Sequence, residues 1–366
     1  MGQTTLKPKF MSDRADRIIG VDIAKIVAMI LVVAVHVNGY GLPYEGNNPP
    51  GLGYLLLRSF LDAIFDACIN IFAIASGYVG IVSSFKLSRI IRLWIQVVFT
   101  GLMVLVCIDL FTGIDVHNID YLKACFPIAK RQYWYMTAYF MLCFVMPLIN
   151  VGIKALSRNE LRNMVLLLLG VICGEWFICY ISALGTEGGY SFEWLLVLYV
   201  VGAYLRLYNP LDKYKWSLMS CACGCAMTDG WMPFVLQAVH FKRGFGFSGY
   251  TSPFIVLISL CIFALCLKVR VASERLRKAI VLLSSTTLGV YLIHVQPVVF
   301  RSVFPQLVNK TSVSGGGAYL CLIIVTTIAI YIVCTLLDFL RIILFRLIGR
   351  MASTVPWSLL SRKLND

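Results

Sequence analysis

Lys25 and His36 have the chemistry that stands out first, because both lie in one apolar stretch near the N-terminus. On an α-helix, the eleven steps between them make three turns plus about 20°, so both side chains lie on one face. Asp22, Met29 and Val32 fall on the same face. Imidazole transfers protons at neutral pH and can act as a nucleophile. An apolar helix with ionisable groups along one face predicts a functional site.

A second polar stripe lies in the next apolar run. Ser59, Asp62, Asp66 and Asn70 are spaced so that a helix places them on one side. Either aspartate is a candidate to orient the His36 imidazole, as carboxylates do in catalytic carboxylate–histidine pairs. Hydrogen bonding between helices is the structural alternative for both.

The composition indicates a membrane protein. Of the 366 residues, 59% are hydrophobic and 14% are charged, whereas soluble domains have about 25% charged residues. The mean hydropathy is +0.82. The apolar runs have the length of about 20 residues that spans a bilayer. We therefore expect an all-α, polytopic protein in the cell membrane, with residues 1–366 forming one membrane domain.

About ten membrane-spanning helices are expected, with a polar cavity between them. Their predicted positions are 21–40, 56–82, 93–112, 133–150, 163–182, 191–208, 216–238, 252–268, 280–300 and 318–345.

The distribution of basic residues predicts the orientation. Alternate connecting segments and tails hold 23 of the 32 Lys and Arg residues, and the remaining loops hold 6. The positive-inside rule then places both termini in the cytoplasm, including an N-terminal segment 1–17 and a tail 346–366. Lys25 should lie toward the cytoplasm, and His36 and His294 in the outer half. The net charge of +14 is explained by these loops and does not indicate nucleic-acid binding.

Several candidate residues have structural alternatives. Arg89 and Arg92 are helix neighbours whose guanidinium groups suit a phosphate ligand, but basic loops also set topology. Lys25 binds a ligand or extends its ammonium to the membrane surface. Ser76, which precedes a glycine, lies at a close helix contact or in a cavity wall. His294 belongs to the active site or lies at the membrane interface.

No metal site is predicted. Cys221, Cys223 and Cys225 alternate along an expected helix, so neighbours in this set point about 200° apart and cannot bind one ion together. The thirteen cysteines are scattered, mostly in apolar runs, and we interpret them as free thiols.

Taken together, these features resemble acyltransferase family 3, whose members are membrane enzymes that acylate extracytoplasmic glycans. The matching features, in chain order, are Lys25 and His36 with ten residues between them, the run Asn70–Tyr78 with its Ser76-Gly77 pair, Arg89-x-x-Arg92, and Leu288–His294 with its Gly-x-Tyr-Leu-x-His pattern. Two positions depart from the family pattern. Lys25 stands where many members have Arg, and Asn70 where many have Asp, so no catalytic carboxylate is assigned to residue 70.

The resemblance implies a membrane O-acyltransferase with acyl-CoA, most simply acetyl-CoA, as donor. Lys25, Arg89 and Arg92 would hold its phosphates, with Ser76 in the same site, at the cytoplasmic side. The acyl group would extend along the first span to His36.

At the outer side, His36 would act as general base or as transient acyl carrier, with Asp62, Asp66 and His294 as further candidate catalytic residues. The implied acceptor is a hydroxyl of a glycan or a lipid-linked sugar. Two alternatives remain: a transporter of lipid-linked sugars, and a non-catalytic membrane protein that keeps the same fold. The oligomeric state is not predicted.

Overall fold

The protein is helical throughout its described part. The computed structural model describes residues 17–39, 51–179, 185–240, 245–304, 306 and 316–354, with side chains described as far as Phe345. No strand occurs in these ranges. A backbone within lipid must satisfy its own hydrogen bonds, and a helix does so within one segment. The all-α class predicted from the sequence is confirmed.

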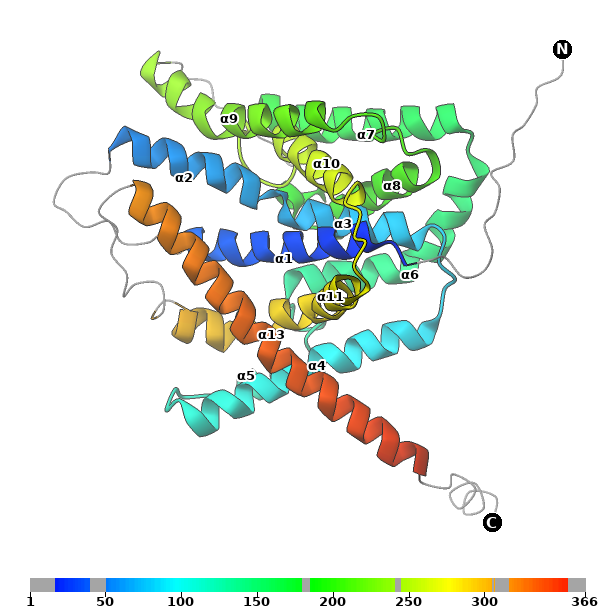
Figure 1. Ribbon diagram of the computed structural model, residues 1–366, viewed down its shortest axis with the longest axis vertical. Coiled ribbons are helices and arrows are strands. Elements are labelled where there is room, and N and C mark those ends of the chain that lie inside the picture. Colours follow the sequence, from blue (N-terminus) through cyan, green and yellow to red (C-terminus); the bar gives the residue numbers. More distant parts are fainter. Residues whose placement is uncertain are drawn as a thin grey trace.

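Figure 1 shows the helices in chain order. The α-helices are α1 (Ile19–Gly39), α2 (Leu52–Phe65), α3 (Ala67–Gly80), α4 (Leu87–Phe111), α5 (Asn118–Cys125), α6 (Trp134–Ala155), α7 (Arg158–Cys179), α8 (Phe192–Tyr208), α9 (Trp216–Ala238), α10 (Pro253–Leu267), α11 (Glu274–His294) and α13 (Gly316–Thr354). The short 3₁₀-helix η2 covers Glu187–Gly189, and the π-helix η3 covers Val299–Val303.

Within the described ranges, seven segments are long and apolar enough to cross a membrane. They are α1, α2 with α3, α4, α6, α7, α11 and the Gly316–Phe345 part of α13. The other three predicted spans correspond to α8, α9 and α10. Two of these are short, with 17 residues in α8 and 15 in α10, where a span needs about 20. The multi-pass class is supported, while the count of ten and the side of the termini stay predictions.

Helix α1 lies at the centre of the bundle. It contacts α3, α10, α11 and α13, and Figure 1 shows it crossing the middle of the molecule between α3 and α11. Ala24, Ala28 and Val33 on this helix are fully buried. The polar residues of α1 therefore lie among other helices.

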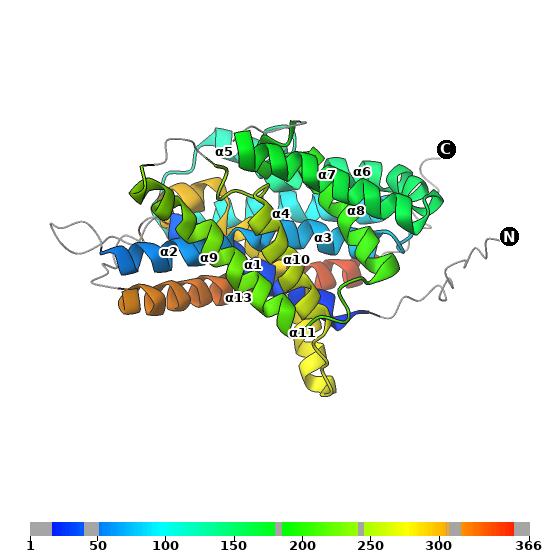
Figure 2. The same ribbon diagram turned by 90° about the horizontal axis from the view of Figure 1, so that it is seen from above.

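The contact between α3 and α8 depends on two glycines. A Cβ atom at Gly77 would overlap the backbone oxygen of Tyr199, and one at Gly202 would overlap that of Ile74. Small residues permit such close helix contacts. Figure 2 shows another close pair, with α9 and α10 side by side across the bundle.

The predicted span 56–82 consists of two helices that meet at Asp66. This residue is the C-cap of α2 and the N-cap of α3, with φ −63° and ψ −16°. Its near-helical backbone keeps the two helices in succession, as Figure 1 shows.

The last helix is longer than predicted. Helix α13 runs obliquely across the bundle and continues to Thr354, beyond the predicted end of the span at 345. Arg341, near the predicted end of this span, is 7% exposed and bonds to Asp338 at 2.5 and 2.8 Å. Its charge is therefore satisfied within the bundle, where Asp338 packs against Gly289 of α11.

Candidate functional site: a histidine pair above a basic cavity

Two histidines meet where α1 and α11 end. His36 is in the last turn of α1 and His294 is the last residue of α11. Their Nδ1 and Nε2 atoms, respectively, lie 3.1 Å apart. They are 258 residues apart in the chain, and the contact between α1 and α11 brings them together.

The hydrogen bonds define which nitrogen atom of His36 is available. His294 Nδ1 lies 2.6 Å from the Val290 carbonyl oxygen. A carbonyl oxygen only accepts, so this nitrogen carries the proton, and His294 Nε2 must accept. In the neutral pair, His36 Nδ1 therefore donates to His294, and His36 Nε2 keeps its lone pair. This is the arrangement that a general base or a nucleophile requires.

Aromatic side chains surround the pair. The Phe300 ring approaches His36 edge-on, with centroids 5.1 Å apart. Tyr291, one turn before His294 on α11, lies 6.3 Å from the His294 ring. Phe300 belongs to η3, and π-helical turns occur frequently at functional sites. These rings limit the orientations open to both imidazoles.

At the other end of α1, both carboxylate oxygens of Asp22 accept hydrogen bonds. Arg17 donates to its two oxygens at 2.9 and 2.7 Å, and Ser284 of α11 donates at 2.7 Å. This hydrogen-bonded carboxylate raises the pKa of the Arg17 guanidinium. Lys25, one turn further, lines a cavity.

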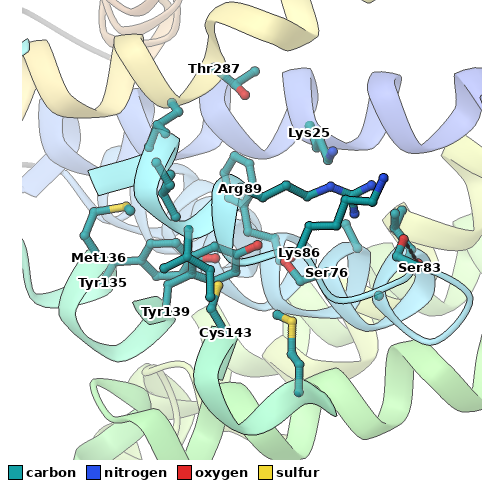
Figure 3. A pocket seen from close by; sticks show the side chains of 18 of the residues that line it. Lys25, Ser76, Ser83, Lys86, Arg89, Tyr135, Met136, Tyr139, Cys143 and Thr287 are labelled. Atoms are coloured by element: carbon teal, nitrogen blue, oxygen red, sulfur yellow. Dashed lines mark hydrogen bonds between the residues drawn. The ribbon is translucent and has the colours of Figure 1, made fainter. Parts of the chain in front are cut away.

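That cavity has a volume of about 710 Å³ and lies between α1, α3, α4, α6 and α11. Among the described residues, its lining includes four basic ones, Lys25, Lys86, Arg89 and Lys154, and no aspartate or glutamate. Figure 3 shows Lys86 and Arg89 on one side of it, with Lys25 reaching in from α1. The volume is typical of cofactor and small-molecule sites. The charge favours an anionic ligand.

The cavity follows the predicted stripe of α1. Lys25, Met29 and Val32 all line it, and His36 is the next residue on the same face. Tyr291 lines it from α11 and also neighbours His294. The cavity therefore extends from the basic side chains to the level just below the histidine pair.

The two predicted arginines differ in position. Both are near the start of α4. Arg89 lines the cavity and donates to the Ser84 carbonyl at 3.3 Å. Arg92 is exposed and is not part of the lining.

Lys86 and Lys154 were not identified from the sequence as residues of this cavity. Lys86 could have been found as the residue one helical turn before Arg89, while nothing in the sequence connects Lys154 of α6 to this site.

Ser76 lies in the wall of the cavity, which is one of the two positions that the sequence predicts for it. Its hydroxyl donates to the Phe72 carbonyl at 2.9 Å, and Figure 3 shows the side chain in the cavity wall. The neighbouring Gly77 makes the close contact with α8. Asn150 of α6 also lines the cavity, donating to Gly80 and accepting from Tyr199.

Asp62 and Asp66 lie elsewhere. Asp62 accepts from the Asn38 side chain and lies 4.0 Å from Arg58, while Asn38 accepts from Tyr319 of α13. This network holds the end of α1 just beyond His36.

In the structure, His294 contacts the Nδ1 side of the His36 ring, the position that the sequence pattern suggests for Asp62 or Asp66. Neither carboxylate lines the basic cavity. Asn70, the last residue of the predicted polar stripe, donates to the Tyr250 carbonyl and accepts from Trp194. Residues of the predicted stripe therefore form hydrogen bonds to other helices and to a loop, as Asp62 does to α1 and Asn70 does to α8 and the loop at Tyr250.

Comparison with known proteins identifies the family. The family model for the acyltransferase domain of acyltransferase family 3 matches residues 18–337, which is nearly the whole chain. This range contains both histidines of the pair and every residue that lines the basic cavity. No curated protein and no solved structure matches significantly. The chain therefore belongs to acyltransferase family 3, and it is a membrane acyltransferase.

Proposed function

We propose that the protein transfers an acetyl group from cytoplasmic acetyl-CoA to a hydroxyl of an extracytoplasmic or lipid-linked glycan. The observation that carries this proposal is the basic cavity that extends along α1 to just below His36. An acyl-CoA is a polyanion with a long, thin arm that ends in a thioester. Such a molecule matches a cavity that is cationic at one end and ends just below the histidine pair at the other.

The charge of the cavity supports binding of the CoA phosphates. Lys86, Arg89 and Lys154 are exposed at the rim, and Lys25 is half-buried further in. Phosphate oxygens accept short, charge-assisted hydrogen bonds from such groups. The excess of Lys and Arg in alternate loops predicts that this rim lies on the cytoplasmic side, where acetyl-CoA is found.

The histidine pair supports the chemical step. The acceptor oxygen forms a bond to the acetyl carbonyl carbon, the C–S bond breaks, and CoA leaves. His36 Nε2 takes the hydroxyl proton and passes it to the thiolate. In the second route, His36 Nε2 itself attacks the carbonyl carbon and CoA leaves as the thiolate. The acceptor hydroxyl then displaces the imidazole, and its proton passes to the thiolate. Both routes need the nitrogen that the hydrogen bond to His294 leaves free.

A second hollow supports approach of the acceptor from the opposite side. It has a volume of about 380 Å³ and is lined by residues that include Asp115, Asp120 and Arg301. Arg301 follows Phe300, the residue that contacts His36. Carboxylate and guanidinium groups both bind sugar hydroxyls.

The test uses membranes that contain the protein, radiolabelled acetyl-CoA and the glycan pool of the cell that makes it. Wild-type protein should label the glycan, and the His36→Ala variant should not. His240→Ala changes an exposed histidine outside the site and is the matched control. Transfer by His36→Ala at the wild-type rate would refute the mechanism, and no transfer by wild type would refute the donor or the acceptor.

A further inference from the structure

One buried hydroxyl in the cavity has no evident structural partner. The side chain of Tyr291 is 5% exposed, and its hydroxyl has no hydrogen-bond partner that meets normal geometry among the described residues. Tyr291 also lines the cavity. Buried tyrosine hydroxyls usually have a partner, and an exception in a native fold requires an explanation. A ligand in the cavity would supply the missing acceptor.

The start of α6 lies at the same place. The rings of Tyr133 and Tyr135 are 6.0 and 6.1 Å from the Tyr291 ring, respectively. The backbone N–H of Tyr135 lies near the oxygen of the Tyr291 hydroxyl, so the O–H proton is the part of this group that has no acceptor among the described residues. The N-cap, Tyr133, makes no side-chain capping bond. The first amides of a helix have no acceptor within the helix and favour negative charge nearby. Tyr135 and Met136, two of these first residues, line the cavity, as Figure 3 shows.

These donors lie beside the histidine pair. The Tyr291 ring is 6.3 Å from the ring of His294, which in turn lies 3.1 Å from His36 through its Nε2 atom. Figure 3 shows Tyr135 and Met136, at the start of α6, on the opposite side of the cavity from the charged ends of Lys86 and Arg89. A thioester that enters between the cations and the histidines would place its carbonyl group among these donors.

We propose that the Tyr291 hydroxyl and the N-terminal amides of α6 form an oxyanion hole for the thioester carbonyl oxygen. This inference rests on the proposed function and adds a catalytic residue to it. When the attacking atom bonds to the carbonyl carbon, the C=O π electrons move to oxygen, which becomes an oxyanion. The O–H of Tyr291 and the amides of α6 stabilise that charge. The electrons return as the C–S bond breaks and CoA leaves as the thiolate, which is then protonated.

A second tyrosine provides the matched control. The Tyr331 hydroxyl on α13 is also buried without a partner among the described residues, and its ring is 8% exposed. Tyr331 does not line the cavity. Tyr291→Phe and Tyr331→Phe therefore remove the same atom from similar surroundings, once inside the proposed site and once outside it.

Steady-state kinetics with acetyl-CoA should separate the two variants. Tyr291→Phe should lower kcat about 10²–10³-fold, the usual loss for one oxyanion-hole donor, with an unchanged KM for acetyl-CoA. Tyr331→Phe should keep the wild-type kcat. Equal losses in both variants, or an unchanged kcat in Tyr291→Phe, would overturn the inference.

A spectroscopic readout keeps this inference separate from the proposed transfer. Acetyl-CoA carrying ¹³C in its carbonyl group is bound to purified protein without acceptor, and the infrared carbonyl band is recorded. Hydrogen bonding in the hole should lower the band frequency in wild type and in Tyr331→Phe, and Tyr291→Phe should lose most of that shift. If glycan labelling fails but this pattern appears, the inference holds and only the proposed transfer is refuted. An unshifted band in wild type would overturn the inference.

Discussion

The two ends of α1 satisfy their polar groups differently. Around Lys25 there are several cations, which are mostly exposed, and none of the described aspartates and glutamates lines their cavity. Around His36, the polar contacts are few and specific: one imidazole, and beyond it a network through Asn38. The first arrangement suits binding of charge, and the second suits holding one atom in one orientation.

This difference predicts how substitutions at each end should behave. At the binding end, several cations share one ligand, so the loss of one should be tolerated. At the histidine end, each hydrogen bond depends on the next, so the loss of one should be severe.

The largest effect is expected at His36. His36→Ala should lower kcat for acetyl transfer about 10²–10⁴-fold, the usual contribution of a general base. Rates at saturating acetyl-CoA, with the amount of protein in the membrane measured in parallel, provide the test. A rate within the error of wild type would show that His36 does not act in catalysis, and the proposed difference between the two ends of α1 would be wrong.

A smaller loss is expected at His294. His294→Leu removes the acceptor of the His36 Nδ1 proton and should lower kcat about 10–100-fold, as for partners that orient a functional histidine. His294→Gln should restore part of the rate, because its side-chain oxygen can accept in place of Nε2. If the Gln and Leu variants are equally slow, His294 does not act through this hydrogen bond.

At the binding end, single changes should be mild and confined to KM. Lys86→Gln, Arg89→Gln and Lys154→Gln should each raise the KM for acetyl-CoA about two- to fivefold, as expected for exposed charges. Their combination should raise it further without changing kcat. A fall in kcat with constant KM would mean that these residues do not hold the donor.

The smallest effects should come from Arg92 and from salt. Arg92→Gln should leave KM unchanged, because Arg92 does not line the cavity. Added salt should raise KM in wild type and less in the triple variant, because charges more than about 10 Å apart are screened at 0.1 M salt. A KM change in Arg92→Gln equal to that in Arg89→Gln would restore the paired role predicted from the sequence.

The sequence predicted the parts of the site that follow from periodicity. The helical period places Lys25, Met29, Val32 and His36 on one face, and the structure has the first three of these in the cavity wall. Length and hydropathy likewise predict most of the helices, since a segment in lipid has few other conformations.

Contacts between distant segments could not be predicted in this way. Nothing local pairs His36 with His294 or turns Asp62 toward Asn38. These contacts depend on crossing angles and on which small residues permit close approach, as Gly77 and Gly289 do. The position of Lys154 beside the cavity depends in the same way on how α6 packs.

The central claim is that donor binding and chemistry are performed by opposite ends of α1. Equilibrium binding of acetyl-CoA to purified His36→Ala, compared with wild type, tests it most directly. The account predicts the same Kd for both proteins, although the variant no longer transfers acetyl groups. A Kd that rises in His36→Ala as much as in the combined Lys86, Arg89 and Lys154 variant would contradict it.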